Sequence, residues 1–203
     1  MPLLQNGMYA KNEDFPYEVE ETYYLQFHIK SALIAIHKLT TADIKTEDFE
    51  SVAQYYHFYS DHLLFSWGQI TNRFKLNTSR GKAVRCNYLY NKTNFPILSC
   101  RYPRNTIEHL DENNRRIIEE GKGVGGFNFI DNTTPEILSN FLRKERHTHP
   151  YTYDYKKKKL LIERVEDDNT SKRLTINLQK LEKELKTLKK NVDDFYDFIK
   201  DKI

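Results

Sequence analysis

The C-terminal part of the chain carries an apolar seam that only a helix brings onto one face. Its apolar residues recur in alternating steps of three and four, at Leu178, Leu181, Leu185, Leu188, Val192, Phe195 and Ile199. This is the heptad spacing of a helix with one narrow apolar face. The sequence therefore predicts a long terminal helix. Its seam is compatible both with packing on its own chain and with packing on a second subunit.

Two segments in the first half also have helical spacing. One apolar stripe recurs at Phe49, Val52, Ala53, Tyr56, Leu63, Trp67, Ile70 and Phe74. This stripe predicts a helix with one face in the core. An earlier segment opens at Pro16 and is apolar on nearly all sides over residues 32–36. That composition predicts a helix buried within a bundle.

Turn and cap residues predict two more helices. One is expected over about residues 79–91, ahead of Pro96, and the next begins near Pro103 and ends at Gly121. Proline is favoured in the first helical turn, and glycine is favoured just past the last one. Residues 1–122 are therefore predicted to form a bundle of four antiparallel helices.

Beyond residue 122 the pattern changes to that of strands. Tyr151, Tyr153 and Tyr155 alternate with polar residues, and a further strand is expected near residues 127–130. Residues 160–165 and 173–176 flank a turn-forming Asp-Asp-Asn sequence, which predicts a hairpin. The chain is thus predicted to be mainly α. Residues 1–122 form the bundle, and residues 123–203 form an appendage with a small antiparallel sheet and the terminal helix, which packs on the bundle or on a dimer partner.

Composition narrows the class of protein. The 203 residues include 30% charged residues with a net charge of +3, so RNA binding would need a local basic patch. The only cysteines, Cys86 and Cys100, lack metal-ligand spacing, and the first residues do not resemble a secretion signal. No stretch approaches the roughly 20 apolar residues of a membrane span. We therefore expect a cytoplasmic protein without a membrane segment.

The candidate chemistry lies near the start of the fourth predicted helix. Arg104, Asn105 and His109 fall within little more than one helical turn, with Glu108 and Asp111 beside them. Arginine keeps its charge and offers a planar fork of donors to phosphate oxygens, whereas histidine exchanges a proton near neutral pH. Asn105 and His109 are i,i+4 neighbours on a helix. These groups suit metal-free phosphodiester chemistry.

The Arg104-Asn105-x-x-x-His109 motif resembles the signature of HEPN domains. These are helical nucleotide-binding and ribonuclease domains of prokaryotic toxins, abortive-infection proteins and RNA-guided effectors. The resemblance covers about residues 17–120 and implies a homodimer in which two motifs form one metal-independent ribonuclease site. It implies that Arg104, Asn105 and His109 are catalytic, with Glu108 and Asp111 as possible support.

The resemblance also implies RNA as substrate, no cofactor and no metal. It implies a role as a toxin or in phage defence, with a possible antitoxin or defence-system partner. Family members paired with a nucleotidyltransferase antitoxin carry a tyrosine two residues after the histidine, where this chain has Asp111. That difference argues against silencing by modification of such a tyrosine.

Three other interpretations remain open. In the first, the chain is a non-catalytic HEPN-like module that binds nucleic acid or protein. In the second, it is an interaction protein that works through its C-terminal seam. In the third, Arg104 and Glu108 form an ordinary i,i+4 surface pair and His109 has no role in catalysis.

Other polar clusters give weaker signals. His147 and His149 supply too few ligands for a metal site. His57 and His62 are predicted to be core or boundary residues, and the lysines at 156–159 are predicted to lie in a solvated turn.

Overall fold

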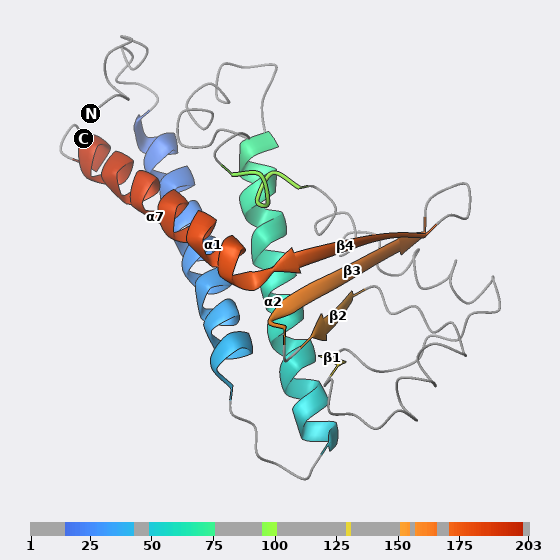
Figure 1. Cartoon of the computed structure of the whole chain (residues 1–203). Coiled ribbons are helices and arrows are strands. Elements are labelled where there is room, and N and C mark those ends of the chain that lie inside the picture. Colours follow the sequence, from blue (N-terminus) through green and yellow to red (C-terminus); the bar gives the residue numbers. More distant parts are fainter. Residues whose placement is uncertain are drawn as a thin grey trace.

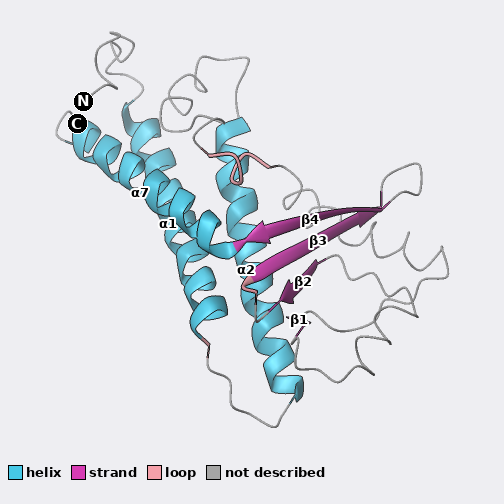
Figure 2. Ribbon diagram, viewed as in Figure 1, coloured by secondary structure: helices cyan, strands magenta, loops and turns pink. Residues whose placement is uncertain are grey.

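The computed structural model describes residues 15–42, 49–75, 95–100, 129–130, 151–154, 157–165 and 171–200. Within these residues the chain is mainly helical, with one small sheet (Figure 2). The helices are α1 (Phe15–Thr41), α2 (Phe49–Lys75) and α7 (Leu178–Lys200). The strands are β1 (Phe129–Ile130), β2 (Tyr151–Asp154), β3 (Lys159–Val165) and β4 (Ser171–Asn177). The helices predicted over residues 79–91 and from residue 103 lie outside the described residues.

Helices α1 and α2 form an antiparallel pair (Figure 1). The predicted stripe helix is confirmed as α2, and its apolar face lies in the core. The largest buried side chains of the pair are Leu25, Ile29, Ile36, Leu39, Tyr56, Leu63, Leu64, Trp67 and Ile70. Each such side chain contributes about 1.5–3 kcal/mol to folding when it leaves water. Mutual burial of the two stripes therefore stabilises the pair.

The segment that is apolar on nearly all sides was predicted to be a helix buried in a bundle, and Ile34 departs from that prediction. Ala32, Ala35 and Ile36 are fully buried, but Ile34 is 55% exposed and Phe27 is 56% exposed. Among the described elements α1 packs on α2 and α7. Since these helices cover only part of its circumference, the apolar residues on its remaining side face outward in the described structure.

Helix α7 packs along α1 of the same chain (Figure 1). The predicted terminal helix is confirmed, and its seam is buried at Leu178, Leu181, Leu185, Leu188, Val192 and Phe195. The seam therefore packs on its own chain, which the heptad spacing alone did not distinguish from packing on a second subunit. Gln26 of α1 also donates a 2.9 Å hydrogen bond to Asp193 of α7. Asn177 caps the helix by accepting a 3.0 Å hydrogen bond from the backbone N–H of Lys180.

The sheet has the strand order β1-β2-β3-β4. β1 pairs with β2 in parallel, and the other neighbours are antiparallel, with Leu160 opposite Ile176 in the β3–β4 hairpin. The predicted hairpin is confirmed. Its apolar face contributes Leu160, Ile162 and Ile176 to the same buried cluster as the helices. Elements from both sides of residue 122 thus share one core, while residue 122 itself lies outside the described residues.

Lys157 and Lys158 form a turn between β2 and β3. Asp154 accepts a 2.9 Å hydrogen bond from the backbone N–H of Lys157, and Lys158 has a φ of 50°. The backbone N–H of Leu178 donates a 3.2 Å hydrogen bond to the carbonyl of Lys158, so the turn also contacts the start of α7. Of the lysines predicted to lie in a solvated turn, Lys157 is exposed and Lys158 is a half-buried turn residue. Lys159 differs from the prediction, because it begins β3 and is half-buried, and Lys156 lies outside the described residues.

None of the three described helices combines the length and the apolar composition that a bilayer crossing needs.

Candidate functional site

The predicted catalytic residues lie outside the part of the chain that the structure describes. This holds for Arg104, Asn105 and His109, and equally for Glu108 and Asp111. The structure does describe residues 95–100, the segment that leads to the motif. The described part of the candidate site is therefore this segment together with the elements that hold it.

Helix α2 holds this segment in place through Trp67. The indole Nε1 of Trp67 donates a 3.2 Å hydrogen bond to the carbonyl oxygen of Leu98, and this contact is buried. Leu98 and Phe95 are also buried in the common core. Water does not compete for a buried hydrogen bond of this kind, so the bond fixes the position of the segment relative to α2.

Helix α7 holds the same segment through Glu184. The two carboxylate oxygens of Glu184 accept hydrogen bonds of 3.1 Å from the backbone N–H of Ile97, and one also accepts a 2.9 Å bond from that of Leu98. Hydrogen bonds to an ionised acceptor are about twice as strong as neutral ones. The segment turns within itself as well, since Cys100 N–H donates to the carbonyl of Ile97 at 3.0 Å.

Residues 95–100 are thus held by one helix that precedes them in the sequence, α2, and one that follows them, α7. Arg104 follows Cys100 by only four positions. The anchors on Trp67 and Glu184 therefore set the point from which the chain continues toward the predicted motif. Sequence reasoning identified Trp67 as a core residue but missed Glu184.

A hollow of about 630 Å³ lies beside this segment. Its walls come from residues 95–100, from β4 and from the first turns of α7, and they include the partly buried apolar side chains of Ile97 and Leu174. Lys180 and Lys183 line it as well, and both are exposed. The volume lies within the range of about 300–1,000 Å³ for small-molecule sites. An apolar hollow with cations on its lining suits a ligand with an apolar body and a negative charge.

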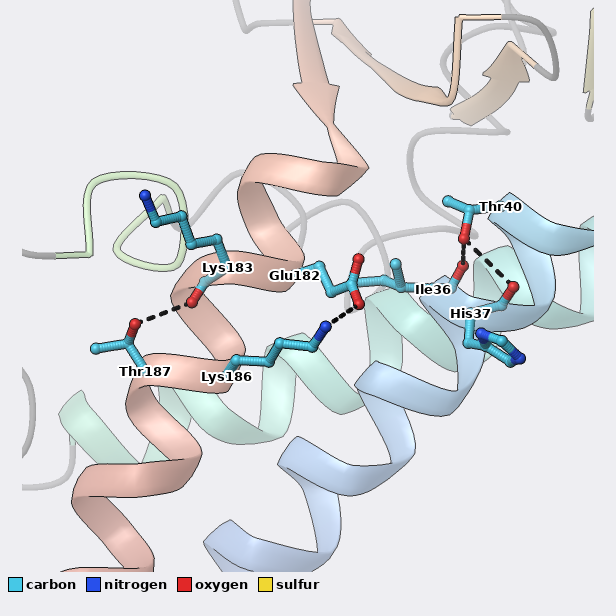
Figure 3. Close-up of polar contacts among 7 residues, drawn as sticks. All are labelled: Ile36, His37, Thr40, Glu182, Lys183, Lys186 and Thr187. Atoms are coloured by element: carbon cyan, nitrogen blue, oxygen red, sulfur yellow. Dashed lines mark hydrogen bonds and ion pairs between the residues drawn. The ribbon is translucent and has the colours of Figure 1, made fainter.

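A second, shallower hollow of about 420 Å³ continues along α7. Lys183 lines both hollows, and Lys186 and Lys190 line the second. Lys186 pairs with Glu182 at 2.6 Å, and Thr187 donates a 3.0 Å hydrogen bond to the carbonyl of Lys183. In Figure 3 the side chain of Lys183 extends toward the pale green segment formed by residues 95–100.

The histidines of α2 are boundary residues, as predicted. His57 Nε2 lies 3.2 Å from Asp61 Oδ2, and both side chains are more than 40% exposed. His62 stacks on Phe58 with ring centroids 6.2 Å apart. His57 and Asp61 form an i,i+4 pair along the helix surface, which is a common stabilising arrangement.

The described residues contain no group of three or more His, Cys, Asp or Glu side chains that could hold a metal ion. The other histidine pair, His147 and His149, lies outside them. No family model matches the chain, and no curated protein or solved structure matches it either.

Proposed function

We propose that the protein is a metal-independent endoribonuclease of the HEPN type that acts as a homodimer. The observation that carries this proposal is the spacing Arg104-Asn105-x-x-x-His109, which follows a segment that is fastened to Trp67 and Glu184. A mainly helical fold is compatible with a HEPN-like bundle. The resemblance is one of motif and fold class, and the assignment of chemistry rests on the side chains of the motif.

The proposed reaction uses the RNA itself as nucleophile. The 2′-hydroxyl oxygen bonds to the adjacent phosphorus while the bond from phosphorus to the 5′-oxygen breaks. His109 takes the proton from the 2′-hydroxyl, or gives one to the leaving oxygen, and Arg104 stabilises the charge on the phosphoryl oxygens. The products are a 2′,3′-cyclic phosphate and a 5′-hydroxyl end. Asn105 orients His109 or a phosphate, with Glu108 and Asp111 in support.

A dimer supplies what one chain lacks. Acid and base steps need two proton-transfer groups, and a twofold axis beside the motif brings two copies of His109 together. Single-stranded or looped RNA is the expected substrate, because its flexible backbone lets the 2′-hydroxyl align with the leaving oxygen. The setting that we propose is a cytoplasmic toxin or phage-defence protein with an antitoxin or defence-system partner.

The decisive experiment incubates purified wild-type protein and His109→Ala with single-stranded RNA in the presence of a chelator. We expect the wild type to leave 2′,3′-cyclic phosphate ends and the variant to leave the RNA intact. Light scattering at micromolar concentration is expected to give the mass of a dimer. Intact RNA with the wild type, or equal cutting by both proteins, would show that the catalytic assignment is wrong.

A non-catalytic HEPN-like module that binds nucleic acid is the alternative. The lysine-lined hollows on α7 favour it, because they need no catalysis to bind an anion. Binding without cleavage by the wild type would establish this alternative. An interaction protein that works through the seam is a poorer fit, since Leu185 and Leu188 are buried against the same chain.

A further inference from the structure

We infer that the hollow beside residues 95–100 binds one nucleotide of a single-stranded RNA, with the base in the hollow and the phosphates on Lys180 and Lys183. The identity of the ligand as RNA rests on the proposed function. The site itself is a nucleotide pocket on α7 and β4, and its described lining includes none of the predicted catalytic residues.

The lining and the volume of the hollow suit a nucleobase. Ile97 and Leu174 give it apolar walls, and the exposed Thr175 of β4 also lines it. A nucleobase is flat and largely apolar on its faces, and every base has such a face, so this kind of contact tolerates different sequences. A volume of about 630 Å³ holds a base together with its ribose.

The charge around the hollow suits phosphate. Within the described residues, Lys180, Lys183 and Lys190 are exposed and form no ion pair. The acidic residue on the lining, Glu184, directs both carboxylate oxygens to backbone N–H groups of residues 97 and 98. The lysine ammonium groups therefore face solvent, whereas the Glu184 carboxylate is hydrogen-bonded to the backbone, and the hollow attracts a negative ligand.

The spacing of the lysines suits a strand rather than a single phosphate. Lys183 lines both hollows and Lys190 lines the second. Seven residues separate them, which on a helix is an axial distance of about 10 Å. A strand whose base enters the first hollow is thus able to place successive phosphates along α7.

The position of the hollow links it to the proposed chemistry. Cys100 lines it, and Arg104 follows Cys100 by four positions. We therefore expect a nucleotide held there to belong to the same stretch of RNA as the phosphate that the motif would attack. The hollow would then select where on an unstacked strand the cut is made.

The test measures binding in the His109→Ala protein, in which the RNA stays whole. A fluorescein-labelled single-stranded RNA of about twelve nucleotides, within the range of single-strand site sizes, is titrated by fluorescence anisotropy at several salt concentrations. Lys180→Ala with Lys183→Ala is expected to weaken binding about tenfold. It is also expected to reduce the salt slope by about 1.4, since each phosphate contact in a single strand accounts for about 0.7.

The matched control is Lys30→Ala with Lys38→Ala, which removes two exposed lysines from α1. It makes the same change in net charge away from the hollow. We expect it to leave affinity within about twofold and the salt slope unchanged, because long-range charge is screened beyond about 10 Å. Equal losses in the two double variants would overturn the assignment of the lysines.

A second variant tests the base in the hollow. Thr175→Trp adds a bulky ring to the lining of the hollow, so it should weaken binding about tenfold without changing the salt slope, since it displaces a stacked base and removes no cation. Gln54→Trp is the control, at an exposed position about 20 Å along the axis of α2 from Trp67. Inorganic polyphosphate that competes as well as RNA, or unchanged affinity in Thr175→Trp, would overturn the nucleotide site in favour of nonspecific anion binding.

The two proposals fail separately. If the wild type leaves RNA whole while the Lys180, Lys183 and Thr175 variants bind it weakly, the pocket stands and the nuclease proposal is wrong. If the wild type cuts RNA and these variants bind as tightly as their parent, the nuclease stands and the pocket is wrong.

Discussion

The phenolic hydroxyl of Tyr153 donates a 2.6 Å hydrogen bond to the backbone carbonyl of Leu39. Leu39 lies in the last turn of α1, where carbonyl groups have no partner within the helix. The neighbouring carbonyl of Lys38 accepts a 3.2 Å bond from the hydroxyl of Tyr55. Two tyrosines, one from the sheet and one from α2, thus cap the end of α1 and tie three elements together.

The first prediction is that Tyr153→Phe destabilises the fold. The change removes the hydroxyl and leaves the buried carbonyl of Leu39 without this donor, which costs about 1–3 kcal/mol. Urea unfolding followed by circular dichroism measures the loss of unfolding free energy. Tyr23→Phe, at an exposed position on α1, is the control and should change stability by less than about 0.5 kcal/mol. Equal stabilities for the two variants would contradict the capping role.

The second prediction concerns how the stability contributed by Tyr55 depends on pH. Burial, together with the neighbouring Tyr59, raises the pKa of Tyr55 above its usual value of 10.0. The folded state therefore holds this proton more tightly than the unfolded chain does. The resulting stability is fully present below the unfolded pKa and is lost as the pH rises through the folded pKa.

Urea midpoints of the wild type and Tyr55→Phe, compared across the range from about pH 9 to pH 11, test this because that range spans the unfolded pKa of tyrosine. The advantage of the wild type should shrink as the pH rises, since an ionised Tyr55 no longer donates to the carbonyl of Lys38. A difference between the two proteins that stays constant with pH would rule the effect out.

The third prediction is that Lys158→Gly stabilises the β2–β3 turn while Lys157→Gly destabilises it. Lys158 has a φ of 50°, a left-handed conformation that costs a residue with a Cβ about 1–2 kcal/mol and costs glycine almost nothing. Lys157 has no positive φ, so glycine there adds freedom to the unfolded chain, and it also removes the ammonium that lies 3.6 Å from Asp154 Oδ2. Thermal unfolding should rank the proteins as Lys158→Gly, wild type and Lys157→Gly, and the reverse order would contradict the turn geometry.

The fourth prediction ties stability to the proposed site. Glu184→Ala removes the charged acceptor from the backbone N–H groups of Ile97 and Leu98 and should cost about 1.5–3 kcal/mol. Glu182→Ala removes only the exposed pair with Lys186, which is worth about 0.5 kcal/mol or less. Because Glu184 anchors the segment that leads to Arg104, its variant should also cut RNA more slowly than the Glu182 variant at a temperature where both are folded. Equal cutting rates would show that the anchor does not affect the site.

The elements that the sequence predicted best are those with a complete local pattern. The seam at Leu181, Leu185 and Leu188 needs only its own spacing to define a helix and its buried face. The alternation around Tyr153 likewise defines a strand. Neither pattern predicts which element packs against it, because that depends on the tertiary fold. The seam packs on α1 of the same chain, which its spacing alone does not distinguish from packing on a second subunit.

The features that the sequence did not predict depend on contacts far apart in the chain or on backbone geometry. Glu184 looks like one more charged residue beside the seam, and its partners lie 86 and 87 positions earlier. Lys158 occupies a left-handed position that glycine or asparagine would have signalled. For the candidate site, side-chain chemistry alone suggested Arg104 and His109. The structure adds the anchored segment before them and the lysine-lined hollow.

The fifth prediction separates the charge of Arg104 from its shape. His109→Ala should slow RNA cleavage by about a hundredfold or more, the usual scale for a positioned proton-transfer group. Arg104→Ala should do comparable harm, because the charge that builds on the phosphoryl oxygens loses its partner. Arg104→Lys keeps the charge but replaces a planar fork with a point charge, so it should restore only part of the rate. Cleavage rates in chelator, with circular dichroism to check folding, measure all three. Full activity in Arg104→Lys would mean that charge alone matters, and full activity in Arg104→Ala would remove this residue from the reaction.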